Sequence, residues 1–442
     1  MDIIDFERLT ADLAALPRSR RCGHVIAADG SAITIGGLSG WARIGDSIRV
    51  ASMPDEPGAR GEIIAVSETG ARAMVLGVAD GMGLGDRVWL MPEAPLRPSD
   101  QWMGRVIDAY GDPLDGRVLD IGEHPAPLRR PAPPAATRGG LGPRVRTGLS
   151  AMDTILPLAK GQRIGVFAGS GVGKSSLLSG LAREVEADVV VFALIGERGR
   201  ELSSFIADGL GEEGMRRAVL VAATSDESPL TRRRAAWSAM AVAEHFRDQG
   251  RHVLLIVDSL TRFAEAHREI ALTAGETPSL RAYPPSTASM IAGLAERAGP
   301  CGRRAGDGVI TGIFSVLVAG SDMEEPVADI TRGVLDGHVI LDRSIAERGR
   351  FPAIDIGRSV SRCLPDAATA AENAMIAEAR RLTLAFERAT PMLQTGLYQA
   401  GADAQIDRAV ALNPALDSFF ASASTTPELA FEALGRILDQ DV

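Results

Sequence analysis

The chain has 442 residues, which is more than one hydrophobic core normally holds, so we expect two or three domains. Its 45% hydrophobic and 24% charged residues are ordinary for a globular protein and exclude a disordered or fibrous chain. The net charge of -10 excludes attachment to nucleic acid through bulk positive charge, and leaves room only for a local basic groove.

Lysine is almost absent from the chain. Of its 47 basic residues all are arginine except Lys160 and Lys174. The three scattered cysteines argue against a disulfide framework, and the six histidines do not fall at the spacing of a structural metal site. The acidic start is unlike a signal peptide, and no apolar run is long enough to span a membrane. The sequence therefore predicts a soluble cytoplasmic protein.

The first 18 residues predict an amphipathic helix. Five apolar residues between positions 3 and 16 recur at helical spacing, with most of the acidic residues elsewhere. A helix of this length is not stable alone, so it must dock either on its own domain or on a partner protein.

Residues 19–93 predict a small antiparallel β-barrel. Short β-prone runs broken by glycine occur at 24–28, 32–35, 47–50, 61–66, 73–76 and 87–90. A segment rich in proline, glycine and arginine, 125–144, follows as an irregular connection.

Residues 94–364 predict an α/β domain. Apolar runs at 164–168, 189–195, 218–222, 253–257 and 313–318 alternate with longer helical patterns. Fully apolar strands that alternate with helices are typical of a parallel sheet covered on both faces. Residues 365–442 are alanine-rich and predict a helical domain, with an amphipathic stretch at 429–438.

A phosphate-binding loop is the strongest functional signal. It lies between an apolar strand and a helical run, and it comprises Gly169, Ser170, Gly171, Val172, Gly173, Lys174, Ser175 and Ser176. Its backbone N–H groups would cradle phosphate oxygens, while Lys174 would reach the outer phosphates and the Ser175 hydroxyl would bind Mg²⁺. The alternative is a structural glycine-rich turn. Ala168 stands where the simplest pattern has its first glycine.

Two carboxylates complete a nucleotide-hydrolysing pattern. Asp258 directly follows the apolar run 253–257, where it would hold the water shell of the metal ion. Burying a carboxylate there would be costly without such a role. Glu197 follows the run 189–195, at the edge from which a parallel sheet presents its ligands, and would orient the attacking water. The alternative is that Glu197 is a solvent-exposed loop residue without a catalytic role.

With these residues in place, the chain resembles the hexameric ATPases related to the catalytic subunits of rotary ATP synthases. Within that superfamily it is similar to the export ATPases of bacterial type III secretion, above all the flagellar FliI family. The matching text includes GQRIGVFAGSGVGKSSLL, ALIGERGREL, AATSDESPL, AEHFRDQGRHVLLIVDSLTRFAEAHREI and YQAGADAQIDRAV. The resemblance covers almost everything after Met103 and implies a RecA-like P-loop core.

The resemblance also implies residue roles in ATP hydrolysis. Glu197 would polarise the lytic water, with Arg198 supporting the γ-phosphate and Glu201 supporting the water shell of Mg²⁺. Arg362 matches an arginine finger that reaches a neighbouring subunit's site, so hydrolysis would require a ring such as a homohexamer. Phe351 matches an aromatic residue that stacks on adenine, although an ordinary core phenylalanine is the alternative. Ala282 replaces the usual glycine of a loop near the central pore.

The resemblance implies several partners. They are a FliH-like regulatory protein bound through residues 1–18, the membrane proteins of the export gate, and export chaperone–cargo complexes, at the cytoplasmic face of the inner membrane. ATP hydrolysis would help to release chaperones and to unfold or load cargo.

Four other functions are left as alternatives: a virulence-type (injectisome) secretion ATPase, a rotary synthase catalytic subunit, an RNA-translocating ring and a nucleotide-binding subunit without turnover. The small number of aromatic residues in the barrel argues against RNA binding. Lys174, Glu197, Asp258 and Arg362 together argue against a subunit without turnover.

Overall fold

The computed structural model describes residues 20–77, 79–92, 94–304, 306–318 and 322–440. The amphipathic helix predicted at 1–18 lies outside these residues. The described residues divide into two compact units, one formed by those up to residue 94 together with 269–277 and the other by those of 95–268 together with 278–440.

The first unit contains the predicted barrel. Its strands close in the order β1-β2-β5-β4-β3-β6, with every neighbouring pair antiparallel. Their bounds are β1 Cys22–Asp29, β2 Ala32–Gly36, β3 Ser47–Val50, β4 Ala59–Val66, β5 Ala71–Val75 and β6 Arg87–Met91. Inward-facing aliphatic side chains such as Ile35, Ile48 and Ile63 are buried and form a core of their own. Each predicted β-prone run therefore lies largely within one strand of the barrel.

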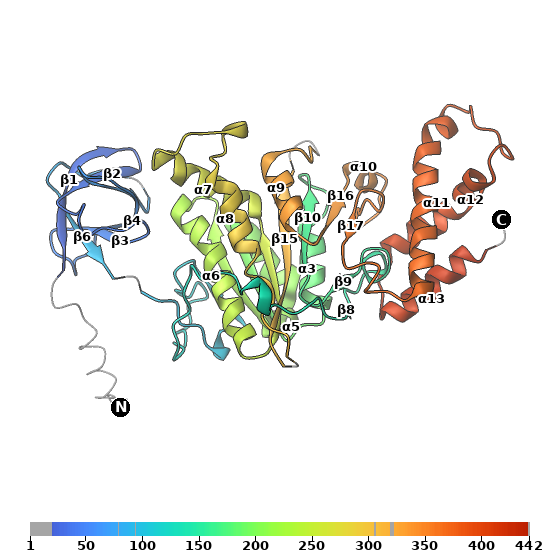
Figure 1. Cartoon of the computed structure of the whole chain (residues 1–442), viewed down its shortest axis with the longest axis horizontal. Coiled ribbons are helices and arrows are strands. Elements are labelled where there is room, and N and C mark those ends of the chain that lie inside the picture. Colours follow the sequence, from blue (N-terminus) through green and yellow to red (C-terminus); the bar gives the residue numbers. More distant parts are fainter. Residues whose placement is uncertain (1–19, 78, 93, 305, 319–321, 441–442) are drawn as a thin grey trace. The chain divides into compact units, whose positions relative to one another are not determined.

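The second unit is built on a largely parallel sheet with the order β17-β16-β10-β15-β13-β11-β12-β7. Figure 1 labels β10, β15, β16 and β17 of this sheet. The strands are β7 Arg105–Ile107, β10 Arg163–Ala168, β11 Val189–Glu197, β12 Ala218–Thr224, β13 His252–Asp258, β15 Val309–Leu317, β16 Gly337–Leu341 and β17 Val360–Ser361, with the short β14 Gly299–Pro300 beside β15. All residues of β13 are buried, as expected of a strand covered on both faces. The strand β15 lies between β10 and β13 and is parallel to both. The carboxyl ends of all three strands therefore lie at one edge of the sheet.

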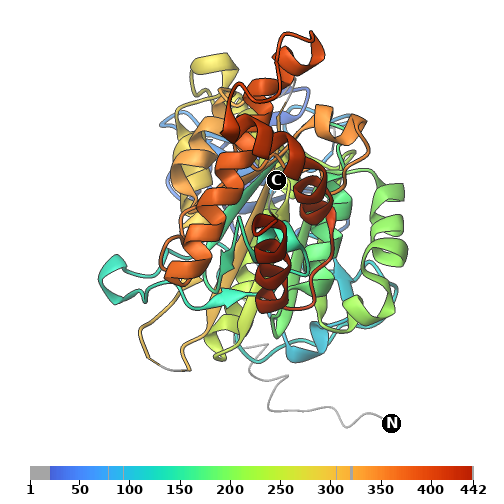
Figure 2. The same cartoon turned by 90° about the vertical axis from the view of Figure 1, so that its right-hand side faces the viewer.

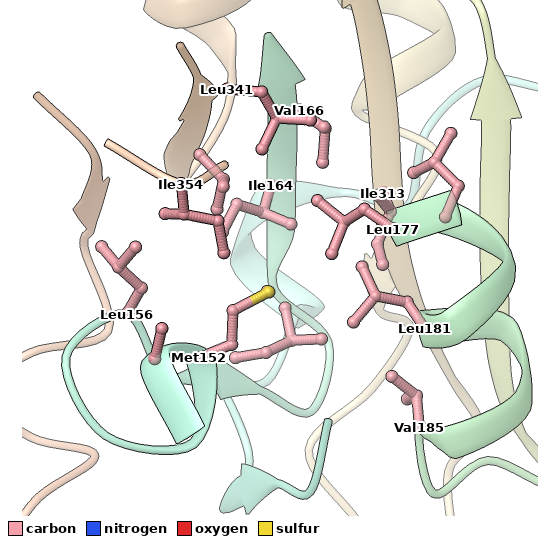
Figure 3. Packing of buried hydrophobic residues seen from close by; sticks show 14 of the residues in the cluster. Met152, Leu156, Ile164, Val166, Leu177, Leu181, Val185, Ile313, Leu341 and Ile354 are labelled. Carbon is pink, nitrogen blue, oxygen red and sulfur yellow. The ribbon is translucent and has the colours of Figure 1, made fainter. Parts of the chain in front are cut away.

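Helices cover both faces of this sheet. One face packs against α6 Pro229–Asp248, α7 Leu260–Thr273, α8 Ser286–Ala295 and α9 Pro326–Val334. The opposite face packs against α3 Lys174–Glu184, and Figure 3 shows Leu177 and Leu181 projecting from this helix toward Ile313 of β15 and Ile164 of β10. Shorter elements connect them: α2 Ser150–Asp153, α4 Gly199–Ser204, the π-helical turn η3 Phe205–Leu210, α5 Gly211–Arg216, α10 Arg343–Glu347, the strand pair β8 Arg144–Val145 and β9 Leu158–Ala159, and the 3₁₀ turns η1 Asp100–Trp102, η2 Ala135–Thr137 and η4 Leu280–Ala282.

The chain ends in the predicted helices, α11 Ala370–Gln394, α12 Ala404–Ala421 and α13 Pro427–Leu438, drawn in orange to red in Figure 2. A capping box between Thr369 and Glu372 fixes the start of α11 by satisfying backbone N–H groups that have no partner within the helix. Apolar side chains of all three helices join the same core as α3, so they are part of the second unit. The predicted fold class is confirmed. Among the described helices, none combines the length and apolar character needed to cross a bilayer.

Candidate functional site

The phosphate-loop sequence forms a tight turn between β10 and α3. Gly171 and Gly173 have φ angles of 77° and 89°, in the left-handed region that glycine adopts without strain. Gly173 caps the N-terminus of α3, and Lys174 is the first residue of that helix. The N-terminus of this helix therefore points its free backbone N–H groups and its positive dipole end at the loop, which is the arrangement that binds phosphate.

The loop lines an open cavity of about 790 Å³ at the carboxyl edge of the sheet. Most of the residues predicted for the site line this cavity: Gly169, Ser170, Gly171, Gly173, Lys174, Ser175, Ser176, Glu197, Arg198 and Glu201. A second cavity of about 450 Å³ is lined by Ser175, Ser176, Glu197, Glu201 and Asp258 among others. The two cavities share Ser175, Ser176, Glu197 and Glu201, so they are two parts of one site, and Asp258 lines the smaller one. The side chain of Val172 instead packs into the hydrophobic core.

A buried cluster of charges lies at the base of the site. Lys174 forms an ion pair with Oδ1 of Asp258, and its Nζ lies 3.8 Å from Oε1 of Glu197. Oδ1 of Asp258 also accepts a hydrogen bond of 2.5 Å from Oγ of Ser315. Lys174 and Asp258 are only 8% and 3% exposed, so their charges interact with little screening by water.

Burial raises the pKa of Glu197 to about 7, and the neighbouring charge of Asp258 adds to this rise while Lys174 opposes it. The structure makes Glu197 the last residue of β11, whereas the sequence suggested a position just after the strand. A carboxylate whose pKa lies near neutral pH is suited to accept and return a proton in a catalytic cycle. The raised pKa would suit Glu197 to the role of general base that the sequence predicts.

Arg198 and Glu201 lie at the rim of the site. Arg198 occupies the position just before α4, and its Nη1 lies 3.7 Å from Oε1 of Glu201. Both side chains are exposed, so the pair adds little to the stability of the fold. The side chain of Glu201 also hydrogen-bonds Glu197, which adds to the rise in the pKa of Glu197.

Phe351 and Arg362 occupy different positions relative to the cavity. Phe351 is 53% exposed, and a Cβ placed on Gly173 would lie 3.4 Å from its Cδ1, so the ring borders the phosphate loop. Arg362 follows β17 and is exposed, with its backbone N–H donating to the carbonyl of Asp336. Arg362 is not among the described residues that line the two cavities.

The sequence missed three side chains at the site. Arg262 and Glu265 line the larger cavity and form an ion pair of 2.8 Å between Nη1 and Oε2. Their position just after Asp258, at the start of α7, was a signal that could have found them. Ser315 was missed because the other residues of the run 313–318 are all apolar, although a polar residue within such a run is itself a signal.

The site fits a magnesium–nucleotide complex better than an all-protein metal site. Within the described residues, no group of three or more His, Cys, Asp or Glu side chains could hold a metal ion. Mg²⁺ needs no such group, because it commonly takes one or two protein oxygens together with phosphates and waters. Ser175 and Asp258 supply suitable oxygens beside the loop.

Comparison with known protein families matches two parts of the chain. Residues 148–361 match the nucleotide-binding domain of the ATP synthase alpha/beta family. Residues 368–427 match the C-terminal domain of the type III secretion ATPase EscN. The two matches together cover the sheet that carries the phosphate loop, apart from its edge strand β7, and much of the C-terminal helical region.

Individual relatives match over nearly their whole length. A flagellum-specific ATP synthase of Caulobacter vibrioides is 45% identical over 95% of this chain and 96% of its own. That of Salmonella typhimurium is 39% identical over 93% and 92%, and a type 3 secretion system ATPase of Pseudomonas syringae is 40% identical over 90% and 89%. The assembled ATPase EscN of enteropathogenic E. coli superposes with a TM-score of 0.87 at 34% identity, over 94% of this chain and all of the other.

Proposed function

The chain belongs to the family of flagellum-specific ATP synthases and type III secretion ATPases, and from this premise we propose that it hydrolyses ATP to energise protein export through the flagellar apparatus. The observation that carries the proposal is the convergence of Lys174, Glu197 and Asp258 beneath the phosphate loop. The C-terminal match to EscN favours an export ATPase over a catalytic subunit of a rotary synthase.

Each residue of the site has one proposed task. The backbone N–H groups at the start of α3 and the ammonium of Lys174 bind the β- and γ-phosphates. Ser175 would hold Mg²⁺ directly, whereas Asp258 and Glu201, which line the same cavity, would hold it through water. Mg²⁺, when bound, supplies charge that stabilises the phosphoryl oxygens. Phe351, which borders the loop, packs against the adenine base.

Glu197 acts on the water that attacks the γ-phosphate. Its carboxylate orients that water and accepts its proton, and a pKa near 7 lets it do so at neutral pH. Arg198 supports the γ-phosphate from the rim of the site.

Arg362 stabilises the same phosphate in a neighbouring subunit. The support for this role is its exposure and its position away from the cavities of its own chain. A site completed by a neighbour requires a closed ring, and solved relatives carry the description of an assembled EscN, alone and with its central stalk EscO. We propose a homohexamer of this chain at the cytoplasmic face of the inner membrane. There it would meet a FliH-like protein through residues 1–18, the export gate and chaperone–cargo complexes.

The test of hydrolysis is Glu197→Gln. This variant keeps the size of the side chain and loses its ability to accept a proton, so turnover should fall by about 10² to 10⁴. Its affinity for ATP should stay within about threefold of the parent, because the phosphate loop is intact. Glu68→Gln, an exposed position on the barrel, is the matched control. Turnover near the parental rate in Glu197→Gln would show that Glu197 is not the general base.

A virulence-type secretion ATPase is the second candidate, and the similarity to the Pseudomonas syringae protein and to EscN supports it. The higher identity and coverage of the Caulobacter protein favour the flagellar system. Deletion of the gene should abolish secretion of flagellar subunits and motility. Intact flagella together with loss of effector secretion would instead assign the chain to the virulence-type system.

A further inference from the structure

Ser315 is an unusual residue for its position in the sheet. It lies in β15, between β10 and β13, opposite Val166 and one residue after the pairing of Phe314 with Val257. Its side chain is 0% exposed, and most of its neighbours along the strand are apolar. A buried hydroxyl in such a place is costly unless it is hydrogen-bonded, and its bond goes to Oδ1 of Asp258.

The two oxygens of Asp258 have different surroundings. Oδ1 takes both the hydroxyl of Ser315 and the ammonium of Lys174. Within the described part of the chain, no hydrogen bond is made to Oδ2, although Asp258 lines the smaller cavity together with Ser175. One oxygen is therefore anchored within the protein while the other remains available to a ligand in the site.

Lys174 and Ser315 differ as partners of Asp258. Under the proposed function Lys174 serves the outer phosphates of ATP, and its long flexible side chain can move from the carboxylate to the phosphates. Ser315 cannot move in this way, because its short side chain is held by a strand paired on both sides. When Lys174 turns to the phosphates, Ser315 is the partner that still fixes the orientation of the carboxylate.

We propose that Ser315 is a positioning residue, which anchors Oδ1 of Asp258 so that Oδ2 faces the water shell of a magnesium ion bound at Ser175. This inference rests on the proposed function and adds to it a residue that does not itself touch the nucleotide. A hydrogen bond to a charged group is stronger than one between neutral groups, so its loss should be measurable in the binding of magnesium–nucleotide.

The experiment measures the dissociation constant of ADP by calorimetry on the full chain, once with excess Mg²⁺ and once with excess EDTA. The ratio of the two constants is the magnesium-dependent gain in affinity. In Ser315→Ala this gain should fall by about tenfold, while the constant in EDTA should stay within about twofold of the parent. Ser315→Thr keeps a hydroxyl and should retain most of the gain.

Thr311→Val is the matched control. Thr311 is also a fully buried hydroxyl of β15, but it bonds His252 and the backbone of Gly161, with distances of 2.8 and 2.9 Å. Its loss should weaken the fold and leave the magnesium-dependent gain unchanged. If Ser315→Ala does not fold, Ser315→Cys, whose thiol is a weak donor, should show the same loss of gain.

The other outcomes distinguish an error in the role of Ser315 from an error in the proposed magnesium site. A parental gain in Ser315→Ala, or an equal loss of affinity with and without Mg²⁺, would overturn the role of Ser315 and leave the proposed function intact. A parent protein that gains no affinity from Mg²⁺ would contradict the proposed magnesium site, and the inference with it.

Discussion

At the scale of single residues, the contrast between Lys174 and Lys160 explains why a chain so poor in lysine keeps one at the site. The ammonium of Lys174 is a compact charge that fits between a carboxylate and phosphates, whereas a guanidinium is planar and wider. Lys160 is half-buried, and its charge helps to hold the pKa of His252 low, after the larger effect of burial. Only the first of these roles depends on the shape of the cation.

The same substitution at both lysines tests this explanation. Lys174→Arg should lower ATP turnover by about 10² to 10³, because the cation is displaced from the phosphates. Lys160→Arg should keep turnover within about twofold of the parent, since a guanidinium retains the positive charge. Steady-state ATPase rates of both purified variants are the measurement. Equal losses in the two variants would show that the chain depends on lysine for a reason unrelated to the phosphates.

The site could be predicted from the sequence where its signals are local. The glycines, Lys174 and Ser175 lie within one short segment, 169–175, and Asp258 ends a recognisably apolar strand. Ser315 could not be placed in the same way, because its contact with Asp258 depends on the register between two strands that are 57 residues apart at this point. The elevated pKa of Glu197 likewise depends on burial and on charges from other elements. The roles of Arg362 and Phe351 stay predictions.

At the scale of elements, the loop before α8 holds a strained backbone. Arg281 and Ala282 have φ angles of 49° and 66° and are the non-glycine residues with positive φ among those described. Backbone bonds from Ala282 to Ser279 and from Ser279 to Tyr283 hold the loop in this shape. The resemblance noted above has glycine where this chain has Ala282, and glycine adopts this conformation without strain. The alanine therefore costs stability in the shape that the loop takes.

Ala282→Gly should raise the free energy of unfolding by about 1 kcal/mol, because it relieves a left-handed alanine. Ala288→Gly, at an exposed position in α8, should lower it by about 1 kcal/mol, since glycine weakens a regular helix. Chemical denaturation of the two variants and the parent measures both effects. A destabilised Ala282→Gly would mean that the loop does not hold Ala282 in the left-handed region.

The elements themselves were predictable to different degrees. The barrel strands and the central strands of the parallel sheet follow from runs of apolar residues, and the C-terminal helices follow from their alanine-rich pattern. The short strands β7, β16 and β17 were not predicted. Their two to five residues carry too little pattern, and they are strands only because β12, β10 and β16 offer them pairing edges.

At the scale of the whole molecule, the role proposed for Arg362 means that one chain holds only part of its catalytic site. The phosphate loop, Glu197 and Asp258 line connected cavities, whereas Arg362 is exposed on the surface beyond them. In a ring with head-to-tail contacts, each interface would pair the cavity of one subunit with Arg362 of the next. Activity should then depend on protein concentration as well as on the integrity of each chain.

Mixing two inactive variants tests this claim most directly. Glu197→Gln and Arg362→Ala should each lose turnover alone, and each should still bind ATP. In mixed rings, about a quarter of the interfaces should pair an intact Glu197 with an intact Arg362, so an equal mixture should regain turnover. A mixture that forms mixed rings and stays inactive, or an Arg362→Ala ring that turns over at the parental rate, would contradict a site shared between subunits.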